Sequence, residues 1–491
     1  MEDEYSDLVQ STVPLIKPRA TSQYAVSTAP KVPGCISARY ALAFFSFLGF
    51  MNVYAMRVNL SVALVAMVNQ TVTNHSSTVC PAPNNTAVPK VGDFNWDQYT
   101  QGQILASFFY GYIFTQLPGG WLADRYGGKK LFGLGVVCTA VFTLITPVAA
   151  SAGYQWLIVV RVLEGLGEGV TFPAMHAMWG HWAPPLERSR LVTMSYSGAY
   201  LGTVVSLPIS GVLCASDILG GWPSVFYIFG TLGVIWFIAW MILVHDKPSV
   251  HPRISDVERS YIETSIGHKE KSSSVPWLSI LTSVRVWAIV IAHFCNNWGF
   301  YTLLTNLPTY LEVVLGFDIS QSGFLAAVPY LVFWCVVLTG GQVADFLRVK
   351  GFLTTTATRK AFTVVGFTLP ATFLVTTGYV GCDHALAVVF LTLSVGCCGF
   401  AASGFNINHL DLAPDYAGLL MGITNMAATV PGFLGPLLVG ALTQHDETFE
   451  QWRIVFWTAF GIYMFGMSVF VILGSGEKQA WAMDKKIGSC A

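Results

Sequence analysis

The stretch PGGWLADRYGGKK, residues 118–130, decides the fold of this 491-residue chain, because a related stretch, TGGQVADFLR, recurs at residues 339–348. Both contain the pattern GGxxAD, and each follows a long apolar segment. Glycine lets neighbouring helices approach closely, and an acid followed by basic residues can form an ion pair between helices. The recurrence predicts two similar halves, an organisation typical of alternating-access transporters.

The composition is that of a membrane protein with many spans. Hydrophobic residues make up 53% of the chain and charged residues only 11%, whereas a typical soluble chain has about 25% charged residues. The net charge of -1 gives no indication of a nucleic-acid partner. Most of the ten cysteines lie in apolar segments and are expected to be packing residues. Cys80 and Cys382 instead fall near non-cytosolic connections, so they could form a disulfide.

Apolar spans of about 20 residues recur along the chain. We expect twelve of them, at 40–68, 101–122, 131–150, 154–180, 190–214, 222–244, 286–314, 322–343, 359–379, 383–406, 416–442 and 453–473. With both termini cytosolic, the tails and cytosolic connections hold all of the 26 Lys and Arg except Arg57, Lys90, Arg161 and Arg453. This bias follows the positive-inside rule. The predicted fold class is an all-α polytopic membrane protein with twelve transmembrane helices in two pseudo-symmetric halves.

The spans divide the chain into five segments. They are a cytosolic tail at 1–38, a six-helix half at 39–244, a cytosolic linker at 245–285, a second six-helix half at 286–473 and a cytosolic tail at 474–491. The loop at 69–100 carries glycosylation sequons at Asn69, Asn74 and Asn84, which fits a secretory-pathway lumen. Apolar positions spaced along the charged linker predict a helix on the cytosolic surface.

The first tail contains Leu15 and Ile16, a candidate dileucine-type sorting signal. The usual form has an acidic residue four positions before the first leucine, and Ser11 stands there. A chance match is therefore an equal alternative.

The fourth span contains RVLEGLGEGVTFPAMHAMW, residues 161–179, with three charged residues in an apolar setting. Arg161, Glu164 and Glu168 fall within roughly 60° of one another on a helix, so they form one stripe that must avoid lipid. Both glutamates can approach Arg161, so one could stay paired while the other carries a proton. Pro173 predicts a bend before His176. The alternative is a purely structural ion pair.

The first span contains a second intramembrane arginine, Arg57. A guanidinium stays charged and offers paired donors in one plane, which suits a carboxylate. This indicates an organic anion as substrate. The alternative is that the side chain extends to the membrane surface.

Several strings resemble known families. The superfamily motif called motif A, typical of the major facilitator superfamily, is matched in full by Gly120, Asp124, Arg125, Gly127, Lys129 and Lys130. Further strings are YAMRVNLSVALV at 54–65, SFFYGY at 107–112, GFYTLLTNLPTY at 299–310, GFNINHLDLAPDYAG at 404–418 and the string at 161–191. Together they resemble the anion-transporter family, which includes lysosomal sialic acid transporters, vesicular glutamate transporters and sodium–phosphate transporters.

The resemblance implies a lysosomal symporter that moves a proton with sialic acid or another acidic sugar to the cytosol. It implies substrate contacts at Arg57, Tyr54, Tyr110, Asn296 and Tyr301, and proton coupling at Arg161, Glu164, Glu168 and His176. A packing role for His176 is equally expected. A conformational latch is expected at the motif residues together with Asp345 and Arg348. Implied partners are the organic anion (glucuronate and acidic amino acids are further candidates), protons, the bilayer and sorting adaptors.

Two positions depart from the glutamate members of the family. Asn296 stands where those members have arginine and mammalian sialic acid transporters have tyrosine, and Ala106 stands where the glutamate members have histidine. These departures argue against glutamate as the main substrate.

Other functions remain open at this point. A vesicular acidic amino acid transporter or a sodium–phosphate type of organic anion transporter would use the same fold, in a synaptic vesicle or the plasma membrane. An anion uniporter or channel would use Arg57 and Arg161 without a coupled proton. The sequence has no metal-ligand cluster, nucleotide loop or nucleophile elbow, so we expect neither an enzyme nor a cofactor nor a metal.

Overall fold

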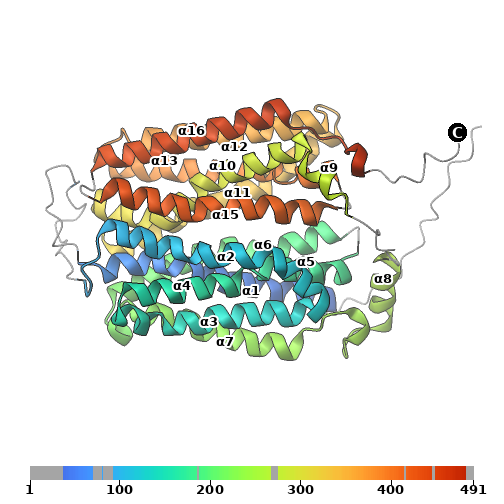
Figure 1. The fold of residues 1–491 in the computed structure, drawn as a ribbon, viewed down its shortest axis with the longest axis horizontal. Coiled ribbons are helices and arrows are strands. Elements are labelled where there is room, and N and C mark those ends of the chain that lie inside the picture. The colour runs from blue at the N-terminus through green and yellow to red at the C-terminus, as the bar shows by residue number, and fades with distance from the viewer. Residues whose placement is uncertain are drawn as a thin grey trace, which may run out of the picture.

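The computed structural model describes residues 37–69, 80, 92–184, 187–266, 275–413, 416–444 and 448–482. Long helices lie side by side through this part of the chain (Figure 1). The first half contains α1 (Ala38–Met67), α2 (Gln98–Tyr126), α3 (Gly128–Ala152), α4 (Tyr154–Glu168), α5 (Thr171–Trp182), α6 (Arg188–Ala215) and α7 (Pro223–Leu243). The connection contains α8 (Asp256–Ile266) and α9 (Trp277–Leu281). The second half contains α10 (Val284–Thr309), η4 (Tyr310–Val314), α11 (Ile319–Val349), α12 (Thr355–Thr377), α13 (His384–Cys397), η5 (Cys398–Ser403), α14 (Asn408–Leu412), α15 (Ala417–Thr443) and α16 (Phe449–Leu473).

Each of the twelve expected spans falls on a helix or on two consecutive helices. By length and composition alone, 9 helices in the described chain are apolar enough to cross a membrane. The other three spans correspond to α2, to α4 with α5, and to α10. The α4 and α5 helices, with 15 and 12 residues, are each too short to cross a membrane alone, and charged or amide side chains lower the apolar character of α2 and α10. These three spans carry most of the candidate site. The all-α fold with twelve membrane helices is confirmed.

The fourth span is broken into two helices. The α4 helix ends at Glu168 and α5 begins at Thr171. Pro173 has no N–H to donate to the carbonyl of Gly169, which explains why the bend lies at this point and not at the proline itself. The tenth span instead changes its helix type without a gap, because α13 ends at Cys397 and the 3₁₀-helix η5 begins at Cys398. The break separates the charged residues on α4 from His176 on α5.

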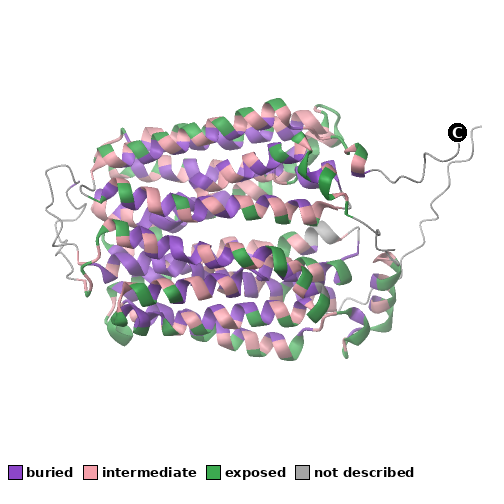
Figure 2. Cartoon of the chain, in the orientation of Figure 1, coloured by how far each residue is buried: buried purple, intermediate pink, exposed green. Residues whose placement is uncertain are grey.

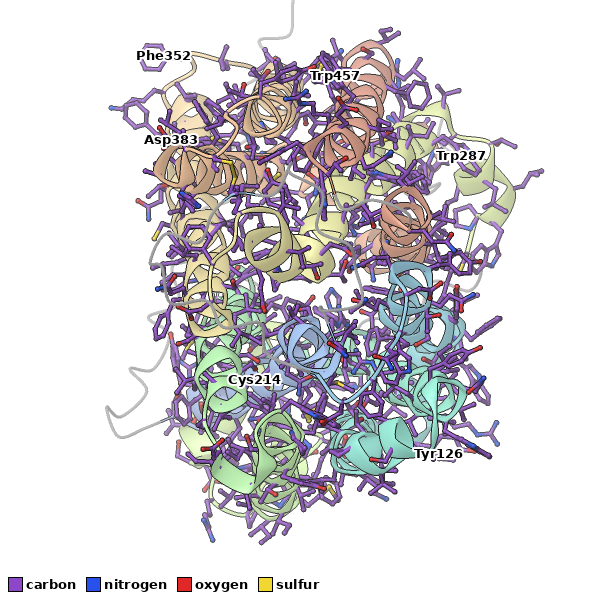
Figure 3. The ribbon with its side chains drawn as sticks, turned by 90° about the vertical axis from the view of Figure 1, so that its left-hand side faces the viewer. Tyr126, Cys214, Trp287, Phe352, Asp383 and Trp457 are labelled. Carbon is purple, nitrogen blue, oxygen red and sulfur yellow. A yellow bond between two sulfur atoms is a disulfide. The ribbon has the colours of Figure 1, made fainter. Side chains whose placement is uncertain are left out.

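The two halves form separate helix clusters when viewed along the helices (Figure 3). They meet along two seams, α2 with α15 and α6 with α11. A Cβ atom on Gly102 would lie 2.6 Å from the carbonyl oxygen of Pro436, and one on Gly323 would lie 2.6 Å from that of Leu207. Glycine is therefore needed where these backbones cross. Both crossings lie near the beginnings of α2 and α11.

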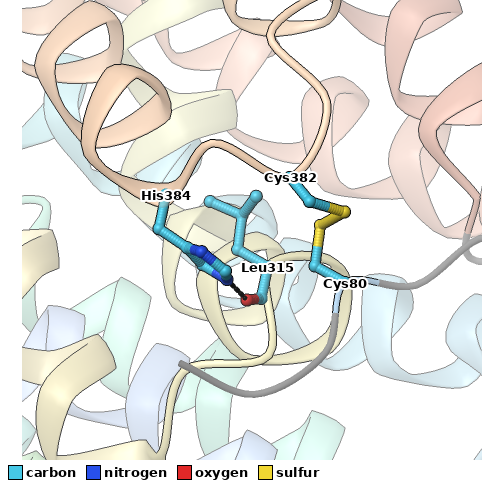
Figure 4. The surroundings of a disulfide bond; sticks show 4 residues. All are labelled: Cys80, Leu315, Cys382 and His384. Atoms are coloured by element: carbon cyan, nitrogen blue, oxygen red, sulfur yellow. Dashed lines mark hydrogen bonds between the residues drawn. A yellow bond between two sulfur atoms is a disulfide. The ribbon is translucent and has the colours of Figure 1, made fainter. Parts of the chain in front are cut away.

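A disulfide joins the two halves at the same end of the bundle (Figure 4). Cys80, from the first large loop, is bonded to Cys382, between α12 and α13, with 5.3 Å between the Cα atoms. The backbone N–H of Cys80 donates to the carbonyl of Val314 at 3.3 Å. Nearby, Nε2 of His384 lies 2.8 Å from the carbonyl oxygen of Leu315. This pairing was one that the sequence allowed, and we call this end of the bundle the disulfide end.

The opposite end carries the linker, and we call it the α8 end. The α8 helix lies across the ends of the long helices (Figure 1), with Ile262 fully buried. Exposed residues lie along the outer helix faces (Figure 2), and many of them are apolar, such as Ile242 and Val148. Lipid contact accounts for such an apolar exterior. The α8 helix is the surface helix that the sequence predicts in the linker.

Candidate substrate and proton site

The centre of the first half contains an ion pair between Arg57 of α1 and Glu168 at the end of α4. The Arg57 side chain is 3% exposed and the Glu168 side chain is fully buried. The sequence suggested that both glutamates of α4 approach Arg161. The structure instead pairs Glu168 with Arg57, because the last turn of α4 faces α1.

Aromatic rings surround the Arg57 guanidinium. Its central carbon lies 4.5 Å from the ring centroid of Tyr54, 4.9 Å from that of Phe108 and 4.6 Å from that of Tyr112. Aromatic faces stabilise a desolvated cation without neutralising it. Tyr54, which the resemblance implies as a substrate contact, thus lies against the arginine, whereas Tyr112 and Phe108 were not singled out from the sequence.

A second ion pair joins Arg161 and Glu164 within α4. The Glu164 carboxylate also accepts hydrogen bonds from the hydroxyls of Thr143 at 3.3 Å and Thr146 at 3.2 Å. Arg161 Nη2 donates to the backbone carbonyl of Arg57 at 3.3 Å. These contacts tie α4 to both α3 and α1. The Glu164 carboxylate thus has three side-chain partners.

The pair formed by Arg57 and Glu168 is less completely satisfied. Within the described chain, the buried Nε and Nη1 atoms of Arg57 and one carboxylate oxygen of Glu168 have no hydrogen-bond partner. Buried polar atoms normally have one. The pair therefore keeps donor capacity that a bound anion or water could use, whereas Glu164 is engaged by both threonines.

The second half contributes Tyr301 and Asn296 from α10. Tyr301 packs against Phe109 with ring centroids 4.9 Å apart and interacts electrostatically with Arg57. The side-chain oxygen of Asn296 is buried and lacks a hydrogen-bond partner in the described chain. The structure thus brings Tyr301 close to Arg57. Tyr110 lies elsewhere, against Phe433 of α15 at 5.3 Å, and not against Arg57.

His176 belongs to a separate contact on α5. Its Nδ1 atom hydrogen-bonds the hydroxyl of Tyr196, and the two rings stack with centroids 5.4 Å apart. Tyr196 also packs against Phe172, which contacts Tyr54. His176 therefore reaches the Arg57 site only through aromatic neighbours.

The motif residues between α2 and α3 form a tight turn fastened by the end of α7. Gly127 has a φ of 93°, which favours glycine. The backbone N–H of Lys129 donates to Asp246 Oδ1 at 2.7 Å, and Trp240 Nε1 donates to the Lys129 carbonyl at 2.9 Å. Asp246 was not expected from the sequence.

Other motif residues occupy the surface of the α8 end. Arg125 lies over the ring of Trp121, with its central carbon 5.3 Å from the centroid, and Lys130 is exposed. Gly120 is half-buried, and no Cβ contact would arise there within 4 Å. The Asp124 side chain lies outside the described atoms.

The second copy of the motif forms a contact within one helix. Asp345 and Arg348 make an exposed ion pair at 3.6 Å, both on α11. This pair does not join two helices, so it differs from the latch expected at this position.

Two polar clusters in the spans were missed by sequence reasoning. Gln116 of α2 donates to Thr429 of α15 at 2.8 Å, and Asn425 donates to Gln116 at 3.0 Å, so these residues join the two halves. The other cluster places the hydroxyl of Thr424 3.2 Å from His293 Nδ1 and 2.8 Å from His409 Nε2. Polar residues in apolar spans were the available signal.

The remaining expected sites lie near or beyond the edge of the described chain. Asn69 follows Val68, the C-cap residue of α1, and its backbone N–H donates to the carbonyl of Phe94 at 2.8 Å. Asn74, Asn84, Leu15 and Ile16 lie outside the described residues. In the part that is described, no cluster of three His, Cys, Asp or Glu residues could hold a metal ion.

Comparison with known proteins identifies the class. The sequence profile of the Major Facilitator Superfamily matches residues 40–436. The chain therefore belongs to the Major Facilitator Superfamily, and it is a membrane transporter and not an enzyme.

Its relatives lie in the anion-transporter family that the sequence resembles. The chain is 52% identical to sialin of Homo sapiens over 468 residues, 94% of each chain. It is 50% identical to sialin of Ovis aries over 496 residues, 99% of each chain. Vesicular glutamate transporter 3 of Danio rerio is 47% identical over 468 residues, which cover 93% of this chain and 77% of the relative. Small organic anions are the substrate class that these relatives support.

Solved structures confirm the fold. The crystal structure of a D-xylose-proton symporter has a TM-score of 0.69 with 13% identity, covering 90% of this chain and all of that chain. A bacterial homolog to the human lysosomal transporter Spinster, inward-facing and occupied, has a TM-score of 0.67 with 13% identity, covering 90% of this chain and 97% of that one. At this identity the likeness concerns the fold alone.

Proposed function

We propose that this protein is a proton-coupled symporter that exports sialic acid and related acidic sugars from the lysosome by alternating access. The similarity to sialin over nearly the full chain supports the substrate class. The observation that carries the proposal is the buried ion pair of Arg57 with Glu168, in which two arginine nitrogens have no hydrogen-bond partner among the described residues.

The pair provides a mechanism for coupling. A proton on Glu168 removes the negative charge that holds Arg57, and the guanidinium then becomes available to a substrate carboxylate. Loss of the proton restores the ion pair and displaces the carboxylate. Proton and anion therefore bind together and leave together, which is the requirement for symport.

The second ion pair keeps the frame in place during this exchange. Glu164 stays bound to Arg161, Thr143 and Thr146, and Arg161 holds the α1 backbone. Under this proposal Arg161 and Glu164 position the site, and Glu168 carries the proton. The substrate pocket is shaped by Tyr54, Tyr301 and Asn296. An indirect effect on the site is left for Tyr110 and His176, because they lie outside the immediate surroundings of Arg57.

Orientation and location follow from the same proposal. The disulfide end faces the lumen, since disulfides form in oxidising compartments, and the α8 end faces the cytosol together with both tails. Asn69, Asn74 and Asn84 then belong to the luminal side, where glycosylation takes place, and the tail that carries Leu15 and Ile16 belongs to the cytosolic side, where sorting adaptors act. In this proposal residues 1–38, 245–285 and 474–491 are cytosolic, and residues 39–244 and 286–473 form the two six-helix halves.

The proton gradient supplies enough free energy to concentrate the anion on one side of the membrane. A difference of about two pH units between lumen and cytosol supplies about 2.7 kcal/mol per proton, which corresponds to about a 100-fold concentration ratio of the anion.

Uptake into proteoliposomes tests the proposal. Labelled sialic acid, glucuronate, glutamate and phosphate are supplied with and without an imposed pH gradient. The proposal expects sialic acid and glucuronate to accumulate only with the gradient. If the gradient drives accumulation of glutamate or phosphate in preference to sialic acid, the protein is one of the alternative anion transporters of the same family. If collapse of the pH gradient leaves the flux unchanged, the protein is a uniporter or channel.

A further inference from the structure

A cavity of about 340 Å³ lies at the α8 end, away from the ion pairs described above. It is enclosed by the first two turns of α1, the end of α7 and the beginning of the linker. Because α1 begins and α7 ends here, the cavity lies at the depth where lipid headgroups meet the protein. The α8 helix lies across this end of the bundle (Figure 1).

One wall of the cavity is apolar. Ala41, Leu42 and Phe45 present one face of α1, and Leu243 adds the last turn of α7. The same helices expose apolar side chains on the outer surface, and Leu243 itself is 37% exposed. The apolar wall is therefore continuous with a surface that contacts lipid.

The other wall is polar and has unused donors. The rings of His245 and His251 lie 4.9 Å apart, and Arg253 lines the same space. The Oγ atom of Ser37 and the Nδ1 atom of His245 are buried and have no hydrogen-bond partner within the described chain. Buried polar atoms without a partner are uncommon and indicate a missing ligand or water.

The charge of this wall is set mainly by Arg253. Burial lowers the pKa of both His245 and His251, so near neutral pH both imidazoles are uncharged donors or acceptors. In the described chain, the Arg253 guanidinium is not in any ion pair, and the residue is exposed. It can therefore reach a ligand at the mouth of the cavity.

The carboxylate that lines the cavity is already engaged. Glu258 accepts the backbone N–H groups of Ala38 at 3.0 Å and Arg39 at 3.2 Å, and the Arg39 side chain at 2.9 Å. Its negative charge is offset by Arg39 and by the amino-terminal end of α1. The groups left for a ligand are thus hydrogen-bond donors and one cation.

We propose that this cavity binds the phosphate headgroup of a phospholipid from the leaflet at the α8 end, with the first part of an acyl chain against Ala41, Leu42 and Phe45. Arg253 pairs with the phosphate, while Ser37 and His245 supply hydrogen bonds. A free phosphate would use the polar wall alone. The apolar wall and its continuity with the lipid-facing surface favour the lipid.

The test measures binding to the purified full-length protein in detergent by native mass spectrometry. The probes are dioctanoyl phosphatidic acid and inorganic phosphate. Arg253→Gln is compared with Lys247→Gln, an exposed basic residue of the same connection that does not line the cavity. We expect Arg253→Gln to weaken binding of the lipid about tenfold or more and Lys247→Gln to change it by less than about twofold. Equal weakening by both variants, or none by Arg253→Gln, would overturn the site.

A second variant separates the two sources of phosphate. Ala41→Phe fills the apolar wall, so it should abolish binding of dioctanoyl phosphatidic acid and leave that of inorganic phosphate unchanged. If inorganic phosphate binds the wild type as tightly as the lipid does, and Ala41→Phe leaves lipid binding unchanged, the site is one for free phosphate and the lipid assignment is wrong. The comparison of Arg253 with Lys247 involves exposed side chains and does not depend on the folding of Ala41→Phe.

Discussion

Arg57 and Glu168 form a buried ion pair between α1 and the last turn of α4, beside the point where the fourth span breaks. The two residues lie 111 positions apart in the sequence. The sequence analysis assigned them different roles, substrate contact to Arg57 and proton coupling to Glu168. Under the proposed function, protonation of Glu168 would free the Arg57 guanidinium for the substrate. Direct contact between the two residues would then couple proton and substrate without a long-range signal.

Substitution of Arg57 tests its role as the carboxylate partner. We expect Arg57→Ala to abolish sialic acid transport, since loss of one member of a buried charge pair costs about 2–5 kcal/mol in binding. Arg57→Lys should restore little, because an ammonium group cannot reproduce the paired donors. Arg57→Ala also leaves Glu168 unpaired, so some loss of stability is expected for this variant at neutral pH. Uptake at the wild-type level in Arg57→Ala proteoliposomes would remove Arg57 from the substrate site.

The two glutamates should behave differently. Glu168→Gln resembles the permanently protonated side chain, so we expect gradient-driven uptake to disappear while substrate exchange across the membrane is retained in part. Glu164→Gln breaks the charge balance with Arg161, and removal of a buried partner costs about 3–5 kcal/mol, so both activities should fall. Uptake and exchange are measured on the same proteoliposomes. Full proton-driven accumulation by Glu168→Gln would shift the proton to Glu164 or His176.

The glycine at the α6–α11 seam should control closure of the disulfide end. Gly323→Ala places a Cβ atom 2.6 Å from the Leu207 carbonyl, and overpacking of this kind costs about 1–3 kcal/mol. We expect a shift toward opening of the disulfide end, visible as faster labelling of a cysteine introduced beside the seam. Gly422→Ala is the control, because a Cβ atom there meets nothing within 4 Å. Equal labelling rates in the two variants would mean that the seam does not limit opening.

The disulfide should stabilise the fold across the two halves. It closes a loop with a sequence separation of 302 residues, and loss of a native disulfide typically costs about 2–5 kcal/mol. We expect the double variant Cys80→Ser with Cys382→Ser to have a lower Tm in detergent. Cys335→Ser, which removes an exposed free cysteine, should leave the Tm unchanged. A Tm unaltered in the double variant would show that the bridge contributes little to stability.

The sequence predicted the overall architecture well because membrane spans depend on local composition. Apolar length and the distribution of Lys and Arg located all twelve spans, and the spacing of apolar positions along the linker located the surface helix α8. The recurrence of GGxxAD indicated two halves, but it could not show that Asp345 and Arg348 pair within one helix while Asp246 fastens the first copy.

The sequence singled out the four charged residues of the candidate site but not the way in which they pair. Intramembrane charge identified Arg57, Arg161, Glu164 and Glu168, because such residues are costly in lipid. Helix periodicity relates residues of one helix only, so it suggested Arg161 as the neighbour of both glutamates. The contact of Glu168 with Arg57 depends on where α1 and α4 lie in the folded bundle, and no local pattern records that arrangement. The polar bridge from Gln116 to α15 was missed for the same reason.

Proton uptake on substrate binding tests the central claim most directly. Purified protein in weakly buffered detergent solution is mixed with sialic acid, and the change in pH is followed with an indicator dye. The wild type should take up about one proton for each substrate bound, because the carboxylate replaces Glu168 at Arg57. Glu168→Gln should bind sialic acid with no proton uptake. Uptake of the same size in Glu168→Gln, or binding without uptake in the wild type, would contradict the account.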